Sequence, residues 1–168
     1  MRTITAKRMT LENFAPYGFF ADMINPRSVK IGERPVEFYR DMVQANLGNP
    51  VVSFSVVKAE KRPMIIDEAE QHFYTAEVIL PLDDDVVIFV APSTNKTVPY
   101  SEFEAFIVPQ NTLVVLKAGV WHKAQFPINK ELCHTLIALP ERTYANDTLV
   151  AAFPEEERIR IEMVSTPT

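Results

Sequence analysis

The sequence contains a single cysteine, Cys133, and this scarcity limits the chemistry of the chain. One cysteine excludes an intrachain disulfide, so the fold must be stabilised by its hydrophobic core. Chains without disulfides are typical of the reducing cytoplasm. We therefore expect a cytoplasmic protein.

Long apolar runs and clusters of positive charge are also missing. The longest apolar stretch, VVIFVAP near residue 88, is far shorter than a membrane span, and the N-terminal MRTITAKRMTLENF lacks the apolar segment of a signal peptide. The net charge is −5, and no run of basic residues exceeds Lys61-Arg62. Because duplex nucleic acids and anionic membranes attract basic surfaces, we expect neither as a partner. A small acidic ligand stays open, since it needs only one or two local cations.

The rest of the composition is that of an ordinary globular domain. Of the 168 residues, 47% are apolar and 23% are charged. A chain of this length can bury one sizeable core. We find no internal repeat, low-complexity tract or linker, so we expect one domain over residues 1–168.

The distribution of apolar runs and turn residues predicts an all-β fold. Runs of β-branched and aromatic residues alternate with clusters of Pro, Asn and Asp about every ten residues, which is typical of sandwiches and closed barrels. Helix is scarce: Thr10 predicts the N-cap of a short turn, LENF, that ends before Pro16. The predicted strands are 51–57, 77–82, 86–91, 104–109, 113–118, 132–139 and 158–164.

Two of the three histidines have a pattern that suits chemistry. In EAEQHFYTAEV, a strand would place Glu70 and His72 on one face, and Glu77 begins the next strand. His122 follows about fifty residues later, after the strand-like run LVVLKAG. Inward-facing residues of different strands converge in the mouth of a β-barrel, and two carboxylates with two imidazoles suit Mn, Fe, Ni or Zn. The alternative is that each histidine is a packed or surface side chain, as most histidines in strands are.

The order of these residues resembles the two sequence motifs of cupins. Those motifs read H-x-H-x(3,4)-E and P-x-G-x2-H, and this chain has E-x-H-x4-E at 70–77 and K-x-G-x2-H at 117–122. Glu70 replaces the first histidine, and Lys117 replaces the proline. The resemblance implies a cupin-type β-barrel, or jelly roll, with a short N-terminal helix. The matching residues are His72, Glu77, Gly119 and His122.

Three further stretches are similar to the ureidoglycolate lyase family, formerly called ureidoglycolate hydrolase. TLENFAPYG (10–18) resembles the family's opening helix and Phe-x-x-Tyr-Gly turn, and VEFYRD (36–41) resembles its Arg-Tyr-His-Asp segment. GVWHKAQF (119–126) resembles its Val-Trp-His segment with a following Phe. The order and spacing hold over about residues 4 to 140, which is most of the chain.

The family resemblance implies that the chain cleaves ureidoglycolate to glyoxylate and urea, a step of purine and allantoin catabolism. It implies a divalent metal (Ni, Mn, Zn or Fe) on His72, Glu77 and His122, with Glu70 as a fourth ligand or as a partner of a ligand. Without metal, His122 would be the general base and Glu77 the general acid. Lys117 would neutralise the carboxylate of the substrate.

The resemblance also implies substrate contacts and an assembly. Tyr39, Arg40 and Lys58 are the expected contacts to a small carboxylate substrate, although Arg40 stands where the family commonly has His and Lys58 where an Asn-Arg-type pair is expected. A homodimer is implied as well. The altered positions leave two alternatives: a non-catalytic cupin that binds a small carboxylate metabolite, or a different cupin enzyme such as an isomerase or dioxygenase.

Overall fold

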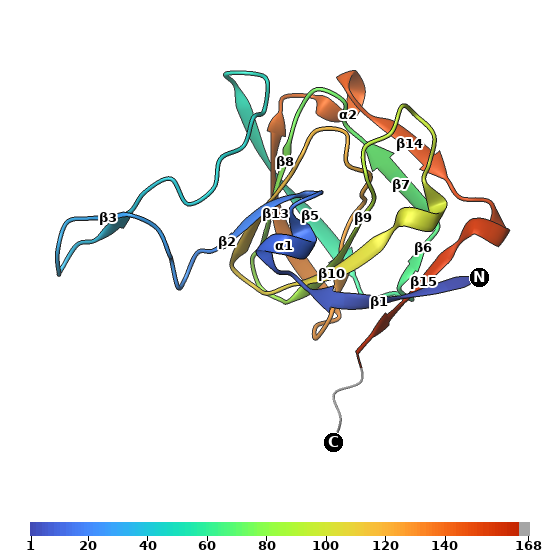
Figure 1. The fold of residues 1–168 in the computed structure, drawn as a ribbon, viewed down its shortest axis with the longest axis horizontal. Helices are drawn as coiled ribbons and strands as arrows, with labels where there is room; N and C mark the ends of the chain where they lie inside the picture. The colour runs from blue at the N-terminus through green and yellow to red at the C-terminus, as the bar shows by residue number, and fades with distance from the viewer. Residues whose placement is uncertain (165–168) are drawn as a thin grey trace.

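Two curled β-sheets form the body of the protein, which the computed structural model describes over residues 1–164 (Figure 1). The six-stranded sheet has the order β12-β9-β10-β1-β15-β6, and the five-stranded sheet has the order β2-β11-β8-β13-β5. Two small sheets, β14-β7 and β3-β4, complete the fold. The strands are β1 (Arg2–Arg8), β2 (Gly18–Asp22), β3 (Lys30–Ile31), β4 (Phe38–Tyr39), β5 (Val52–Glu60), β6 (Ile65–Ile66), β7 (Glu68–Gln71), β8 (Glu77–Pro81), β9 (Val86–Val90), β10 (Glu104–Val108), β11 (Thr112–Leu116), β12 (Phe126–Pro127), β13 (Leu132–Pro140), β14 (Leu149–Ala152) and β15 (Ile159–Met163).

The helices are short and lie at the ends of strands. Thr10 caps α1 (Leu11–Phe14) as the sequence predicts, because its hydroxyl accepts from the Asn13 N–H while the Asn13 side chain accepts from the Thr10 N–H. The second helix, α2 (Thr143–Asn146), follows β13. Two 3-10 turns, Tyr100–Glu102 and Glu155–Glu157, precede β10 and β15.

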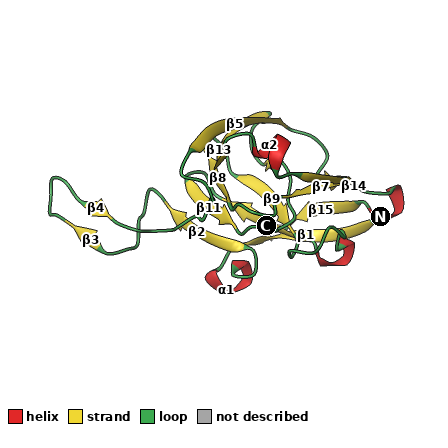
Figure 2. Cartoon of the chain, turned by 90° about the horizontal axis from the view of Figure 1, so that it is seen from above, coloured by secondary structure: helices red, strands yellow, loops and turns green. Residues whose placement is uncertain are grey.

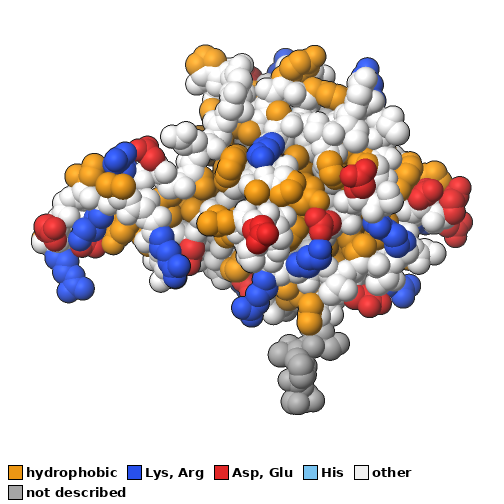
Figure 3. Space-filling view, in the orientation of Figure 1, with side chains coloured by type: hydrophobic (Ala, Val, Ile, Leu, Met, Phe, Trp, Pro, Cys, Tyr) orange, Lys and Arg blue, Asp and Glu red, His pale blue; other side chains and the backbone are white. Residues whose placement is uncertain are grey.

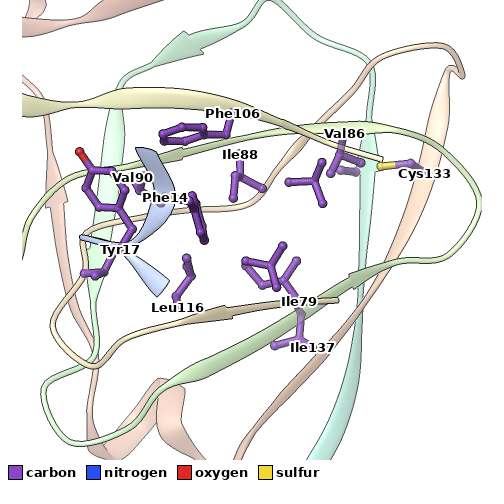
Figure 4. Close-up of a cluster of buried hydrophobic side chains, with 14 residues drawn as sticks. Phe14, Tyr17, Ile79, Val86, Ile88, Val90, Phe106, Leu116, Cys133 and Ile137 are labelled. Atoms are coloured by element: carbon purple, nitrogen blue, oxygen red, sulfur yellow. The ribbon is translucent and has the colours of Figure 1, made fainter. Parts of the chain in front are cut away.

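A close-packed core fills the space between the two large sheets (Figure 4). Phe14 of α1 is fully buried and meets Phe106 of β10 edge to face, with ring centroids 5.2 Å apart. Every residue of β9 is buried, which explains why its sequence is an unbroken apolar run rather than an alternating one. Burial of each large apolar side chain contributes roughly 1.5–3 kcal/mol, so this core anchors the barrel.

A second apolar cluster covers the other face of β9. Trp121 is fully buried there with Phe89 and Phe153, and its indole N–H donates to the Thr94 hydroxyl over 2.7 Å. The side chain of Trp121 is therefore part of the core. This burial also anchors the backbone of the neighbouring His122.

The predicted all-β, cupin-type barrel with a short N-terminal helix is confirmed. All seven predicted strands form, with ends shifted by up to three residues. Strand β1 was not predicted, because only Ala6 of its RTITAKR is fully buried, although β1 lies between β10 and β15 in the six-stranded sheet. None of the helices in the part of the chain that the structure describes is long and apolar enough to cross a membrane.

An arm, residues 24–43, projects from the barrel between β2 and β5 (Figures 1 and 2). It carries the two-residue strands β3 and β4, and its ion pairs join arm residues to each other, as between Lys30 and Glu37. Figure 3 shows hydrophobic side chains exposed between charged ones along it. The exposed large apolar residues of the arm are Ile24, Val29, Ile31, Val36 and Phe38.

Candidate metal and acid–base site

A glycine turn and a backbone bridge bring His122 to the mouth of the barrel. After β11, the chain turns at Gly119, whose φ of +86° favours glycine, and a side chain there would collide with Ser93. His122 then pairs with Glu70 in an isolated bridge: the Glu70 N–H donates to the His122 carbonyl over 2.6 Å, and the His122 N–H donates to the Glu70 carbonyl over 2.9 Å. Two segments about fifty residues apart in the sequence are thereby joined side by side.

One carboxylate oxygen is shared by two imidazole rings. Glu77 Oε2 lies 3.0 Å from His72 Nε2 and 2.9 Å from His122 Nε2. The ring centroids are 5.1 Å apart, and the three residues are between 4% and 7% exposed. His72 directly follows β7, and Glu77 begins β8, so the ends of separate strands create this cluster.

Backbone carbonyls determine which nitrogen of each ring carries a proton. His72 Nδ1 lies 2.8 Å from the Asp147 carbonyl oxygen, and His122 Nδ1 lies 2.9 Å from the Val120 carbonyl oxygen. A carbonyl oxygen only accepts, so each Nδ1 is the donor. In a neutral ring the lone pair is then on Nε2, the atom that faces Glu77. This is how metal-binding histidines are oriented in proteins.

The charges of the cluster reinforce each other. Burial alone would raise the pKa of Glu77, but the charge and hydrogen bond of His122, together with the hydrogen bond of His72, outweigh it and lower the pKa to about 2. Burial alone would lower the pKa of His122, but the charge and hydrogen bond of Glu77 outweigh it and raise the pKa to about 9. Without metal, neutral pH therefore gives a Glu77 carboxylate and a His122 imidazolium.

Glu70 lies at the edge of the cluster and has a cationic partner. Its Oε2 accepts from Lys123 Nζ over 2.9 Å, while its Oε1 lies 3.9 Å from His122 Nε2. One ligand atom each from Glu70, His72 and His122 falls within 4.8 Å of the others. With Glu77 Oε2 beside both rings, the structure brings together all four residues for which the sequence suggests metal binding.

Three residues of the cluster, Glu70, His72 and Glu77, line an open pocket of about 450 Å³, and His122 is not among its lining residues. Side chains of β5 and β13 form its walls, and the segment of residues 140–148, here called the rim segment, contributes to its edge. The lining residues are Ser53, Ser55, Val57, Glu70, His72, Glu77, Ile137, Leu139, Pro140, Glu141, Arg142, Thr143, Tyr144 and Thr148.

The rim segment is tied to the cluster through Asp147. Its carbonyl accepts from His72, and its carboxylate accepts from the N–H groups of Phe73 and Tyr74 over 2.8 and 2.9 Å. One residue of the rim segment therefore holds both the ring and the backbone that follows it. Asp147 belongs to no motif of the sequence, because its role depends on a contact with a residue 75 positions away.

The other predicted site residues lie elsewhere. Lys117 Nζ donates to the Ala15 carbonyl over 2.6 Å and lines a separate hollow beside Phe19. Tyr39 and Arg40 are on the arm, where Arg40 pairs with Asp41. The structure does not bring these three residues to the cluster.

Lys58 is also away from the pocket, for a reason of strand geometry. It is exposed on β5, whereas the pocket is lined by the alternate residues Ser53, Ser55 and Val57 of that strand. Successive side chains of a strand point to opposite faces. A basic residue that does line the pocket, Arg142, was not identified from the sequence, because it belongs to no motif and follows a strand end with no apolar pattern.

A β-barrel with two histidines and two acids gathered at its mouth defines a cupin-type protein. The chain belongs to the ureidoglycolate lyase family, whose sequence profile matches residues 1–162. Its relatives include ureidoglycolate lyases of Mesorhizobium japonicum, 26% identical over 77% of this chain and 82% of the relative, and of Pseudomonas fluorescens, 24% identical over 95% and 96%. A protein of Agrobacterium fabrum is 28% identical over 76% of this chain and 77% of its own.

Solved structures similar to this chain include sugar-nucleotide epimerases. The dTDP-6-deoxy-D-glucose-3,5-epimerase of Legionella pneumophila matches with a TM-score of 0.46 and 10% identity over 77% of this chain and 72% of its own. The dTDP-4-dehydrorhamnose 3,5-epimerase of Elizabethkingia anophelis matches with a TM-score of 0.42 and 11% identity over 79% and 71%.

Proposed function

We propose that this protein cleaves ureidoglycolate to glyoxylate and urea in the pocket beside His72, Glu77 and His122. The observation that carries the proposal is the shared Glu77 oxygen between two buried imidazoles at the edge of an open pocket, in a chain of the ureidoglycolate lyase family. A pocket of about 450 Å³ is ample for so small an acid.

The reaction has simple proton requirements. The hydroxyl proton of ureidoglycolate leaves to a base, the O–H electron pair forms the aldehyde C=O bond of glyoxylate, and the carbon–nitrogen bond breaks. An acid delivers a proton to the departing urea nitrogen. The site must therefore hold one acceptor, one donor and a positive charge for the carboxylate.

A divalent metal fits the donor set of the cluster. We propose His72, His122 and Glu77 as its ligands, with Glu70 as the fourth, because both Nδ1–H groups are held by carbonyls and both Nε2 atoms face the same point. A metal bound there would polarise the hydroxyl and carboxylate oxygens of the substrate.

In the metal-free cluster, the pKa directions assign the proton roles. At neutral pH Glu77 is ionised, so it is the group that can accept the hydroxyl proton, and His122 is protonated, so it is the group that can donate to the urea nitrogen. This is the reverse of the assignment expected from the sequence, in which His122 is the base. Stripping the metal distinguishes the two forms, since only the metal-dependent enzyme then loses activity.

A coupled assay tests the proposed function. Purified protein supplied with Ni, Mn, Zn or Fe is expected to release glyoxylate and urea in equal amounts from racemic ureidoglycolate, up to half of the substrate if one enantiomer reacts. Elemental analysis of the same sample identifies the metal. Ligand-dependent melting shifts with no product above background would instead indicate a cupin that binds without catalysis. A ligand at a hundred times its Kd stabilises the folded protein by about 2.7 kcal/mol, which a thermal shift assay detects.

We further propose that residues 1–168 act as one cytoplasmic domain that forms a homodimer. The pairing of β1 with β15 supports one domain, because it places strands from the two ends of the described chain next to each other in one sheet. The buried free thiol of Cys133 suits the cytoplasm. The arm supports the dimer, because an isolated two-stranded hairpin is marginally stable at best and this one exposes five large apolar side chains.

The dimer has a direct test in solution. Light scattering is expected to show a dimer, with twice the 19.1 kDa mass of one chain, for the unmodified protein. The arm variants Val36→Glu and Phe38→Glu are expected to be monomers. Both positions are exposed, so the substitutions leave the barrel core intact. Leu11→Glu, at an exposed position of α1, is the control and should leave the dimer intact. A monomeric mass for the unmodified protein would contradict the proposal.

A further inference from the structure

The carboxylate of a small acid needs a cation, and the pocket offers one in an unexpected place. Of the pocket-lining residues, three are acids, Glu70, Glu77 and Glu141, while Arg142 alone is a Lys or Arg. Lys123, which contacts the pocket residue Glu70, is already paired with Glu70 and Glu68. Arg142, an exposed residue of the rim segment, is therefore the one Lys or Arg residue at the edge of this pocket.

The backbone at Arg142 departs from ordinary local preference. Its φ of 60° and ψ of 28° lie in the left-handed region, which residues other than glycine rarely adopt. Arg142 is also the N-cap of α2, a position that favours Ser, Thr, Asp or Asn, and it makes no side-chain capping bond. Residues held in such conformations by their surroundings concentrate at functional sites.

The surroundings hold this conformation firmly. The carbonyl of Arg142 accepts from the N–H groups of Ala145 and Asn146 over 2.9 and 3.0 Å. The Thr143 hydroxyl donates to the Pro140 carbonyl, and the Thr148 hydroxyl donates to the Thr143 carbonyl. The backbone that carries the guanidinium is therefore bound at several points around the pocket.

The guanidinium of Arg142 has no ionic partner among the described residues. Within residues 1–164, Arg142 takes part in no ion pair. Arginine can grip a carboxylate with two parallel hydrogen bonds, which a lysine cannot reproduce. The polar side chains that β5 contributes to the pocket wall, Ser53 and Ser55, are neutral and suit an uncharged group such as urea.

We infer that Arg142 binds the carboxylate of a small α-hydroxy acid in this pocket. The inference rests on the proposed function for the identity of the acid, and it adds the residue that recognises it. Arg142 takes the role that sequence resemblance assigned to Lys117, whose Nζ is bonded to the Ala15 carbonyl. It is a binding residue at the pocket edge, separate from the groups that move protons.

Binding measurements with simple probes test the inference without turnover. Calorimetry of the full chain should show that glycolate binds more tightly than its neutral amide, glycolamide. Arg142→Gln is expected to weaken glycolate binding by about 10–100-fold, as the loss of charge-assisted hydrogen bonds would, and to leave glycolamide binding unchanged. Arg142→Lys should fall between the two. Arg160→Gln, at an exposed position of β15, is the matched control and should match the unmodified protein.

The outcomes separate this inference from the proposed reaction. If Arg142→Gln loses the preference for glycolate, the inference holds even when ureidoglycolate gives no product. If Arg142→Gln binds glycolate within twofold of the unmodified protein, or if the unmodified protein does not prefer glycolate, the inference is overturned even when the lyase assay succeeds. In an active enzyme, Arg142→Gln should raise KM by a similar factor while kcat changes little.

Discussion

Replacing His122 with asparagine is expected to lower kcat/KM for ureidoglycolate by roughly 10²–10⁴-fold, the usual contribution of one acid–base group. Asparagine keeps a side-chain N–H near the Val120 carbonyl but removes the Nε2 atom that lies 2.9 Å from Glu77. Steady-state kinetics measure the loss. Elemental analysis of the same variant should show lowered metal content, because one of the proposed ligands is gone.

The third histidine provides the control for this experiment. His134 is partly exposed on β13, and its Nδ1 pairs with Asp83 over 2.7 Å, away from the pocket. His134→Asn should keep kcat/KM within about a factor of two, as surface substitutions usually do. Circular dichroism confirms that both variants are folded. Full activity in a folded His122→Asn variant would remove the cluster from the mechanism.

Replacing Glu77 with glutamine should have the largest effect on stability. Removing one partner of a buried charge pair typically costs roughly 3–5 kcal/mol, because the other charge stays buried without compensation. In chelator-treated protein, unfolding by urea is expected to show a loss of this size near pH 6. Glu162→Gln, on the exposed side of β15, should change the free energy of unfolding by less than about 0.5 kcal/mol.

The Glu77→Gln substitution should also flatten the pH dependence of the free energy of unfolding. The raised pKa of His122 means that its contribution is complete below about 6.5, its ordinary value, and is lost as pH rises through about 9. The lowered pKa of Glu77 means that its contribution is complete above about 4.5 and is lost as pH falls towards about 2. The metal-free cluster is therefore most stabilising between about pH 4.5 and 6.5.

Thermal unfolding with chelator present measures this effect. The rise in the pKa of His122 from 6.5 to about 9 corresponds to roughly 3 kcal/mol of stability that is lost as pH rises over this range. For a chain of this length, that loss lowers Tm by about 6–12 °C. In Glu77→Gln, the decline attributable to His122 should vanish. An equal decline in both proteins would show that other groups cause it.

Much of the barrel could be predicted from local pattern, because its main strands bury side chains in a regular way. The run VVIFV of β9 is buried on both faces and reads as a strand from composition alone. β1 could not be found in this way, since its charged and polar residues owe their place in the sheet to pairing with β10 and β15. The arm has no apolar periodicity of its own, and its two strands are two residues long.

The four residues of the cluster could be proposed from spacing because cupin motifs record which strand ends meet. The distribution of protons could not, since it depends on two carbonyls, those of Asp147 and Val120, that no motif specifies. Lys117, which replaces the proline of the second cupin motif, was assigned to the substrate carboxylate from the family resemblance, yet its side chain turns to the Ala15 carbonyl. Arg142 was missed because its position follows from a backbone conformation rather than from a residue pattern.

The attachment of the rim segment to His72 limits how this pocket can diversify. Asp147 holds the ring and Arg142 begins the same short helix, so lengthening or repacking that loop to admit a bulkier acid would also let the imidazole rotate. Selectivity and reactivity are thereby linked through one turn of backbone. Substitution of the β5 serines, Ser53 and Ser55, would change the pocket with less effect on the cluster, because no comparable hydrogen bond joins them to the ring of His72 or His122.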